Sequence, residues 1–221
     1  MEKGTLYIVS TPIGNLGDIT FRAVETLKKV NFIIAEDTRR TKVLLNAYDI
    51  ETPMRSFHSY NIAKKAEGII KELQKGENVA IVSDSGTPGI SDPGFTFFLK
   101  CIEKEITLIA VPGPTAMVTA LVVSGKPMHS FVFEGFLSNK KARRKKQLAK
   151  FVEEERTVIL YESPHRIVKF LEDFDEVLGE REVVIARELT KKFEEKIRGK
   201  AKDIAEHFKN NKPKGEFVVI F

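Results

Sequence analysis

The stretch VAIVSDSGTPGISDPG, residues 79–94, contains the pattern that decides the fold. It begins with a run of apolar, mostly β-branched residues, which is typical of a strand buried on both faces in a parallel sheet. The run ends in a loop with three glycines and two prolines. Such residues let the chain turn tightly and approach a ligand closely. The stretch therefore predicts one strand of an open α/β sheet, with a candidate binding loop at its carboxyl end.

The same alternation extends to both sides of this stretch. The further strands expected in the first half are 5–10, 32–37 and 108–112, with helices at about 20–29, 39–48, 62–75 and 92–104. Strands alternating with helices favour a parallel sheet covered on both faces. Residues 1–125 are therefore predicted to form an N-terminal α/β domain with a mainly parallel sheet.

A break at GKPMHS, residues 125–130, separates a second part in which strands follow one another more often. The strands expected there are 131–136, 157–163, 182–189, 193–199 and 216–221, with helices at about 140–152, 164–174 and 201–209. Adjacent strands favour a mixed sheet. Residues 126–221 are predicted to be a C-terminal α/β domain, and the fold class is two α/β domains.

Composition excludes several classes of protein. The chain of 221 residues has one cysteine, Cys101, and four separated histidines, so neither a disulfide framework nor a metal site is expected. Its apolar runs are far shorter than the roughly 20 residues of a membrane span, which predicts a cytoplasmic protein without a membrane partner. A net charge of +5 mildly favours an anionic partner.

Four unusual loops follow the predicted strands of the first half. They are STPIGNLGDIT (10–20), AEDTRRT (35–41), SDSGTPGISDPG (83–94) and PGPTA (112–116). None matches a P-loop or a GxGxxG motif, and each proline removes a backbone N–H donor. Such loops are poor phosphate cradles and suit a neutral or cationic ligand, such as the sulfonium of S-adenosylmethionine.

These loops, together with YESPHRI, ARELTKKFEE and KGEFVVI further along the chain, give the sequence its resemblance to a known family. It resembles the tetrapyrrole-methylase superfamily, and within it the branch that methylates cytidine riboses of ribosomal RNA. The resemblance implies a two-lobed, usually homodimeric enzyme that binds S-adenosylmethionine in a cleft between its lobes. The implied reaction is 2'-O-methylation of a cytidine in small-subunit (16S) rRNA. The cofactor contacts that it implies are Ile13, Thr87, Ile90, Pro114, Thr115, Tyr161, Ala186 and Glu216.

A ribose hydroxyl is a weak nucleophile, so a general base would assist its attack. Asp37 and Asp84 end neighbouring predicted strands and are the favoured candidates, while Glu36, Glu134, Glu162 and His165 remain possible bases. The alternative for Asp37 and Asp84 is a helix cap or a turn.

The stretch NKKARRKKQLAK, residues 139–150, carries cations at nearly every position. Clustered Lys and Arg predict contacts with phosphates, although such a run is also typical of a solvated helix face. The predicted RNA-binding residues are Lys140, Lys141, Arg143, Arg144, Lys145 and Lys146, with Arg39 and Arg166 outside the run. Two other functions stay open: methylation of a tetrapyrrole or another small acidic substrate, and non-catalytic RNA binding as a ribosome assembly factor.

Overall fold

The first half of the chain forms a five-stranded sheet in which every pair of neighbouring strands is parallel. In the computed structural model, which describes residues 2–57, 62–91 and 94–221, the strand order is β3-β2-β4-β1-β5. The strands are β1 (Thr5–Val9), β2 (Phe32–Ala35), β3 (Met54–Ser56), β4 (Val79–Val82) and β5 (Thr107–Val111). All residues of β2 and β4 are buried, as their unbroken apolar sequences require.

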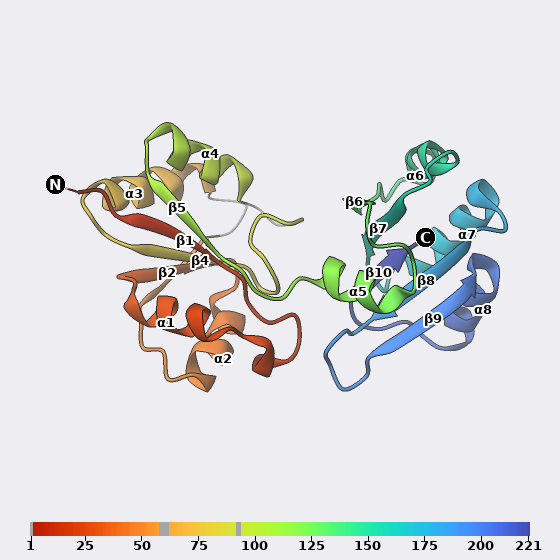
Figure 1. The fold of residues 1–221 in the computed structure, drawn as a ribbon, viewed down its shortest axis with the longest axis horizontal. Coiled ribbons are helices and arrows are strands. Elements are labelled where there is room, and N and C mark those ends of the chain that lie inside the picture. Colours follow the sequence, from red (N-terminus) through yellow and green to blue (C-terminus); the bar gives the residue numbers. More distant parts are fainter. Residues whose placement is uncertain (1, 58–61, 92–93) are drawn as a thin grey trace. The chain divides into compact units, whose positions relative to one another are not determined.

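Helices cover both faces of this sheet (Figure 1). They are α1 (Phe21–Lys29), α2 (Thr38–Ala47), α3 (Ile62–Gln74) and α4 (Phe95–Glu103), with a short 3-10 turn, η1 (Leu16–Asp18). One core packs α3 and α4 against the sheet, and a second core contains residues of α1 and α2. Local capping starts two of these helices, since Thr20 accepts a hydrogen bond from the Ala23 N–H and Asp37 accepts one from the Arg39 N–H.

The second half forms a mixed sheet with the order β6-β7-β10-β8-β9. Strand β6 runs parallel to β7, whereas β10 is antiparallel to both of its neighbours and β9 is antiparallel to β8. The strands are β6 (Phe131–Phe136), β7 (Thr157–Glu162), β8 (Glu182–Arg187), β9 (Glu195–Lys200) and β10 (Phe217–Ile220). The helices are α5 (Ala116–Ser124), α6 (Lys141–Leu148), α7 (Ile167–Leu178) and α8 (Ala201–Asn210), with the 3-10 turn η3 (Ala149–Phe151) after α6.

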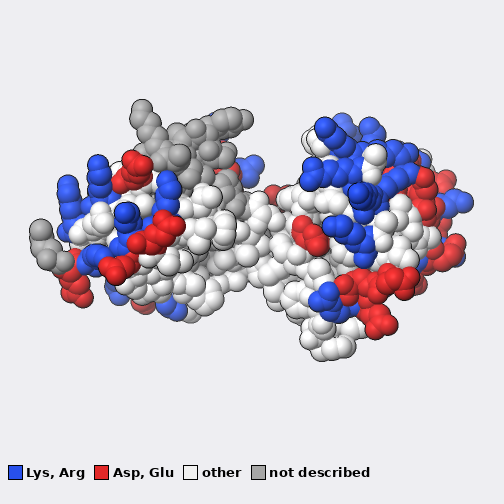
Figure 2. Space-filling model, turned by 90° about the horizontal axis from the view of Figure 1, so that it is seen from above, with Lys and Arg blue, Asp and Glu red and all other residues white. Residues whose placement is uncertain are grey.

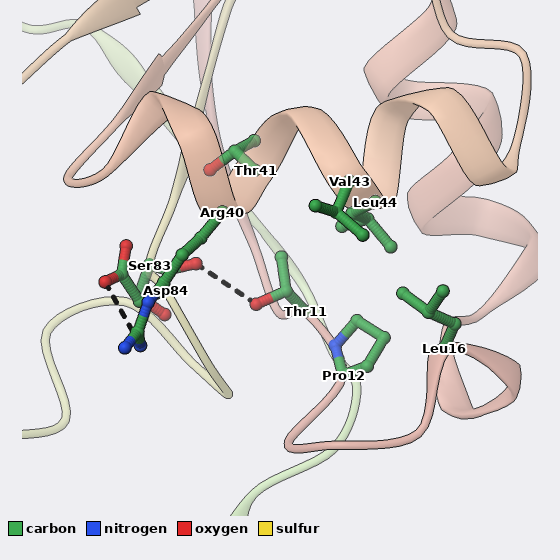
Figure 3. A pocket seen from close by; sticks show the side chains of 9 residues that line it. All are labelled: Thr11, Pro12, Leu16, Arg40, Thr41, Val43, Leu44, Ser83 and Asp84. Carbon is green, nitrogen blue, oxygen red and sulfur yellow. Dashed lines mark hydrogen bonds and ion pairs between the residues drawn. The ribbon is translucent and has the colours of Figure 1, made fainter.

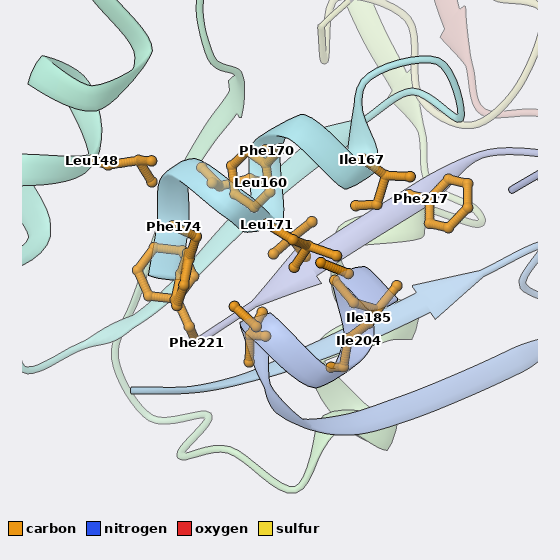
Figure 4. Packing of buried hydrophobic residues seen from close by; sticks show 14 of the residues in the cluster. Leu148, Leu160, Ile167, Phe170, Leu171, Phe174, Ile185, Ile204, Phe217 and Phe221 are labelled. Carbon is orange, nitrogen blue, oxygen red and sulfur yellow. The ribbon is translucent and has the colours of Figure 1, made fainter. Parts of the chain in front are cut away.

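An aromatic-rich core holds this second unit together (Figure 4). Phe174 of α7 packs edge-on against Phe221, with ring centroids 4.8 Å apart, and Phe208 of α8 packs against Phe217 in the same way at 5.5 Å. Helices α7 and α8 also contact each other, while α5 contacts β10, β7 and β8. Alternate residues of the central strands thus face α7 and α8 on one side of the sheet and α5 on the other.

The structure differs from the sequence prediction in the unit boundary, in one additional strand and in the start of α4. The chain divides into units of residues 1–115 and 116–221, ten residues before the expected boundary at 125/126, because α5 packs on the second sheet. The short strand β3 was not predicted, since three residues carry too weak a periodic signal. The predicted helix at 92–104 includes residues 92 and 93, which lie outside the described residues, and α4 begins at Phe95.

Within the described ranges, no helix combines the length and apolar character needed to cross a membrane. The same residues contain no group of three or more His, Cys, Asp or Glu side chains placed to hold a metal ion.

Candidate active site

The loops after β1 and β4 meet at the carboxyl edge of the parallel sheet. Thr11 and Gly86 form an antiparallel bridge, with N–O distances of 2.8 Å from Thr11 to Gly86 and 3.1 Å in the other direction. One residue earlier, the Ser10 hydroxyl lies 2.8 Å from the hydroxyl of Thr87. The Ser10 N–H donates to the carbonyl of Val111 at the end of β5, so three strand ends are joined.

Three of the predicted cofactor contacts gather around Gly86. A Cβ atom at this glycine would lie 3.5 Å from the side chain of Ile13 and 3.8 Å from the carbonyl of Pro114. Gly86 also has a φ of +78°, which favours glycine. The next residue is Thr87, and the Ile90 N–H donates to its carbonyl. Ile13, Thr87 and Pro114 therefore belong to one small region of the first unit.

The chemistry of this region fits a ligand with a sulfonium and few phosphates. Pro12, Pro88, Pro112 and Pro114 supply no backbone N–H, while the paired hydroxyls of Ser10 and Thr87 can accept or donate. Ile13 and Pro88 are buried, and Thr87, Ile90, Pro114 and Thr115 are half-buried. These residues can hold S-adenosylmethionine through apolar contacts, carbonyls and hydroxyls.

Two of the predicted contacts of the second unit share a row of its sheet. Val218 of β10 pairs with Tyr161 of β7 on one side and with Ala186 of β8 on the other. The Tyr161 ring packs against Phe133 and Phe136, with centroid distances of 4.9 and 5.7 Å. The side chain of Ala186 is only 1% exposed, and its contact with a cofactor stays a prediction.

Glu216, the third predicted contact of this unit, is exposed immediately before β10. Its carboxylate lies 3.2 Å from the ammonium of Lys191, and its carbonyl accepts a hydrogen bond from the Glu188 N–H. Because β10 is antiparallel to β7 and β8, Glu216 lies at the edge of the sheet where those two strands end.

The two catalytic candidates, Asp37 and Asp84, lie next to each other, as predicted from neighbouring strand ends. The Asp37 N–H donates to the Asp84 carboxylate at 3.0 Å. Hydrogen bonds from Arg39 hold the pKa of Asp37 well below its usual range, and Asp37 also caps α2. A carboxylate with so low a pKa is a poor proton acceptor, which argues against Asp37 as the general base.

The predicted RNA-binding run forms α6 and its flanks, and the helix divides its cations between two faces. Lys140, Arg143 and Lys146, which recur every three residues, are exposed. Figure 2 shows Lys and Arg gathered over the second unit, on the side where α6 lies in Figure 1. Neither Arg143 nor Lys146 takes part in an ion pair within the described part of the chain.

The other face of α6 is directed at α7. Arg144 is 3% exposed, and its guanidinium lies 2.5 Å from the carboxylate of the equally buried Asp173. Lys141 lies 3.8 Å from Asp173, and Lys145 is paired with Glu176. The prediction that Arg144 contacts RNA is therefore wrong, because its guanidinium is buried in an ion pair with Asp173.

Arg39 and Arg166, predicted outside the run, have different surroundings. The Arg39 side chain is exposed but paired with Asp37 at 2.8 Å. Arg166 is half-buried and donates to the Leu137 carbonyl at 2.7 Å and to Glu162 at 3.2 Å. Burial raises the pKa of Glu162, although the Ser163 N–H and the Arg166 and Arg144 guanidiniums oppose the shift. Arg166 therefore offers RNA only part of its guanidinium.

A solvent-open pocket at the same sheet edge was not predicted (Figure 3). Its lining comes from the ends of β1 and β4 and from η1 and α2: Thr11, Pro12, Leu16, Arg40, Thr41, Val43, Leu44, Ser83 and Asp84. The available signal was the alternation at the end of β1, where Ser10 and Thr11 must point to opposite faces of the sheet. Ser10 joins the loop of Thr87, whereas the Thr11 hydroxyl donates to the Ser83 carbonyl at 3.2 Å inside the pocket wall.

Known proteins resemble this chain in sequence and in fold. The sequence pattern of the Tetrapyrrole (Corrin/Porphyrin) Methylases matches residues 5–205. A protein of Synechocystis named ribosomal RNA small subunit methyltransferase I is 50% identical over 98% of this chain and 78% of its own length. A protein of the same name from Thermotoga maritima is 48% identical over 98% of this chain and 97% of its own length.

Among solved structures, a uroporphyrin-III C-methyltransferase from Thermus thermophilus, complexed with S-adenyl homocysteine, shares the fold at 15% sequence identity. Its TM-score is 0.69, with 98% of this chain and 97% of that chain covered. The two-unit α/β architecture predicted from the sequence is thereby confirmed. From the matched pattern, the close relatives and the shared fold, the chain belongs to the tetrapyrrole methylase family.

Proposed function

We propose that this protein transfers the methyl group of S-adenosylmethionine to the ribose 2'-hydroxyl of a cytidine in small-subunit rRNA. The observation that carries the proposal is the identity of 50% and 48% with two ribosomal RNA small subunit methyltransferases, maintained over 98% of the chain. The corrin and porphyrin methylases at 15% identity share the fold alone.

The same observation ranks the alternatives. If the substrate were a tetrapyrrole or another small acidic compound, we would expect about 50% identity to a methylase of such compounds. The relatives at that level of identity described above are instead named as rRNA methyltransferases. A non-catalytic assembly factor would not need the joined loops around Gly86, where Ile13, Thr87 and Pro114 converge. We therefore favour the rRNA methyltransferase over both.

The cofactor supplies an electrophilic methyl group on a sulfonium centre. In the first unit we assign its binding to Ile13, Thr87, Ile90, Pro114 and Thr115, and in the second to Tyr161, Ala186 and Glu216. The protein's own contribution is mainly to hold the acceptor hydroxyl in line with this methyl group. Alignment of two reactants can supply on the order of 7–11 kcal/mol in favourable cases.

Three exposed cations, Lys140 at the N-cap of α6 and Arg143 and Lys146 within the helix, would hold the phosphates of the RNA. The other face of this helix is held against α7 by the ion pair of Arg144 with Asp173, so the backbone that carries the cations has a fixed position in the second unit. Contacts of this kind position RNA without reading its sequence, and the choice of nucleotide must come from another part of the molecule.

The test is methyl transfer from labelled S-adenosylmethionine to unmodified small ribosomal subunits, followed by digestion to nucleosides and mass spectrometry. We expect 2'-O-methylcytidine, and mapping of the modified fragment identifies the target. A matched variant, Thr87→Arg, fills the hydroxyl side of the predicted cofactor region and should abolish cofactor binding in calorimetry. Label in a base, in another nucleoside or in no RNA would contradict the proposal.

We further propose that the enzyme acts in the cytoplasm as a homodimer, which the family resemblance implies. The support for a second copy is a stripe of exposed apolar side chains on α4, formed by Phe95, Leu99 and Ile102. Light scattering would give twice the mass of the chain, 25.0 kDa, if the proposal holds. The variant Leu99→Glu should then shift the mass toward that of one chain.

A further inference from the structure

We infer that the pocket between β1, β4 and α2 receives the base of the target cytidine and reads its Watson–Crick edge with Arg40 and Asp84. This inference rests on the proposed function and deepens it, because it assigns the residues that select the nucleotide. The pocket is open to solvent, and its lining comes from the ends of β1 and β4, from η1 and from α2.

The polar and apolar parts of the pocket are separated. Figure 3 shows Arg40 reaching down from α2 toward Asp84 at one end, while Val43 and Leu44 lie opposite Leu16 and Pro12 at the other. A planar base needs this combination, with apolar side chains against its faces and polar groups at its edge. Leu16 and Val43 are 40% and 61% exposed, so a bound base can contact both side chains.

Among the residues that the structure describes, the polar pair of Arg40 and Asp84 retains free hydrogen-bonding capacity. The guanidinium of Arg40 is 3.6 Å from the Asp84 carboxylate, which is longer than a hydrogen bond, and its side chain is 65% exposed. One oxygen of Asp84 accepts the Asp37 N–H, and a carboxylate has room for about three further hydrogen bonds. The hydrogen bond from the Asp37 N–H orients the Asp84 carboxylate, and α2 carries Arg40 at the same edge of the pocket.

The pair matches cytosine and opposes uracil. Cytosine presents an N4 amino donor beside the N3 and O2 acceptors, so a carboxylate can accept from N4 while a guanidinium donates to N3 and O2. Uracil presents the O4 acceptor in place of the amino group. That oxygen would face the Asp84 carboxylate without a proton between them, and an unpaired polar group in such a site is costly.

The pocket also lies beside the predicted cofactor contacts. Ser10 and Thr11 are consecutive, and their side chains point to opposite faces at the end of β1. Ser10 contacts Thr87, a predicted cofactor residue, and Thr11 lines the pocket. The pocket and the predicted cofactor contacts therefore share the end of β1 through two consecutive residues.

The experiment uses full-length enzyme and two kinds of small ribosomal subunit, with cytidine or uridine at the mapped target. Wild-type enzyme should methylate the cytidine form at least about tenfold faster, as the loss of one good base-edge contact implies. The variant Asp84→Asn keeps the size of the side chain and its acceptor for the Asp37 N–H, but its amide can also donate to O4 of uracil. We expect the preference for cytidine to fall to about twofold or less, with activity on uridine increased.

The control is Asp37→Asn, which changes the neighbouring carboxylate outside the pocket and should leave the ratio of the two rates unchanged. An Asp84→Asn enzyme that binds S-adenosylmethionine normally and keeps the wild-type ratio would overturn the inference. Equal loss of activity on both subunits, with loss of the acidic limb of the pH–rate profile, would also overturn it and would make Asp84 the general base. If wild-type enzyme forms no 2'-O-methylcytidine, the proposed function itself fails, which is a different result.

Discussion

The two faces of α6 carry the same kind of residue and use it in opposite ways. On the inner face, Arg144 is buried against Asp173, and Lys141 and Lys145 are paired with acidic residues of α7. On the outer face, Arg143 and Lys146 are exposed and form no ion pair among the residues described. The difference shows that a run of cations is divided by helix periodicity into a structural set and a set available to an anionic partner.

The inner set also influences a second buried charge. Glu162 at the end of β7 is 2% exposed, and the positive charges of Arg166 and Arg144 partly offset the rise in its pKa that burial causes. Arg144 also donates to the carbonyls of Ser138 and Asn139, at 3.4 and 3.3 Å, in the segment before α6. The inner face of α6 thus holds the helix, and with it the outer cations, against α7 and the preceding segment.

The largest effect is expected from breaking the inner face. Arg144→Ala removes the closer and buried partner of Asp173 and leaves only Lys141, at 3.8 Å. Removing one member of a buried ion pair typically costs about 3–5 kcal/mol. We expect a loss of that size in the free energy of unfolding, measured by urea denaturation. Arg143→Ala, one residue away on the exposed face, should change it by no more than about 0.5 kcal/mol. Equal losses for the two variants would refute the division of the helix.

Charge reversal on the outer face should act on RNA and spare the fold. Arg143→Glu with Lys146→Glu removes two predicted phosphate contacts, and methylation of small subunits should fall by roughly tenfold to a hundredfold at moderate salt. The slope of log affinity against log salt should become shallower by about 0.7 per lost contact. Lys28→Glu with Lys29→Glu makes the same charge change at the end of α1 and is the matched control. Unchanged methylation and salt dependence would assign the outer cations to a merely solvated surface.

Lys145 lies between the inner and outer faces of α6 and tests where the RNA-binding set ends. It is paired with Glu176, whose own side chain is 60% exposed, and this hydrogen bond lowers the pKa of Glu176. Partly exposed pairs contribute about 0–1 kcal/mol, so Lys145→Ala should reduce stability only within that range. Methylation should stay within about twofold of wild type. A loss comparable to that of the outer variants would place Lys145 in the RNA-binding set.

Much of the fold could be predicted from the sequence because its strands are short, buried and bounded by turn residues. The predicted strand at 79–84 corresponds to β4, and Asp37 and Asp84 lie together because β2 and β4 are neighbours. The pocket could not be predicted, since it depends on the spatial order β3-β2-β4-β1-β5, which is not the order along the chain. Only that order brings α2 beside the ends of β1 and β4.

The burial of Arg144 escaped prediction for a related reason. Its partner, Asp173, lies 29 residues further along the chain, and nothing in the run NKKARRKKQLAK distinguishes Arg144 from Arg143 without the position of α7. The spacing of three and four residues could divide the cations into two sets, but it could not say which set faces the protein. The same limit applies to Asp37, whose capping of α2 was the open alternative to catalysis.

The smallest expected effect is a pH dependence of the free energy of unfolding that arises from the buried carboxyl of Glu162. Because burial raises the pKa of Glu162 above its ordinary value of 4.5, the folded protein holds this proton more tightly than the unfolded chain. Its contribution to stability is therefore fully present at low pH and declines as the pH rises from about 4.5 through the raised pKa.

Glu162→Gln has no such proton to lose and keeps an oxygen that can accept the Ser163 N–H. Denaturant titrations of both proteins between pH 4 and 8 should show the variant gaining stability relative to wild type as the pH rises. A difference that is constant with pH would mean that Arg166, Arg144 and Ser163 fully compensate the burial, and one of opposite slope would mean that they overcome it.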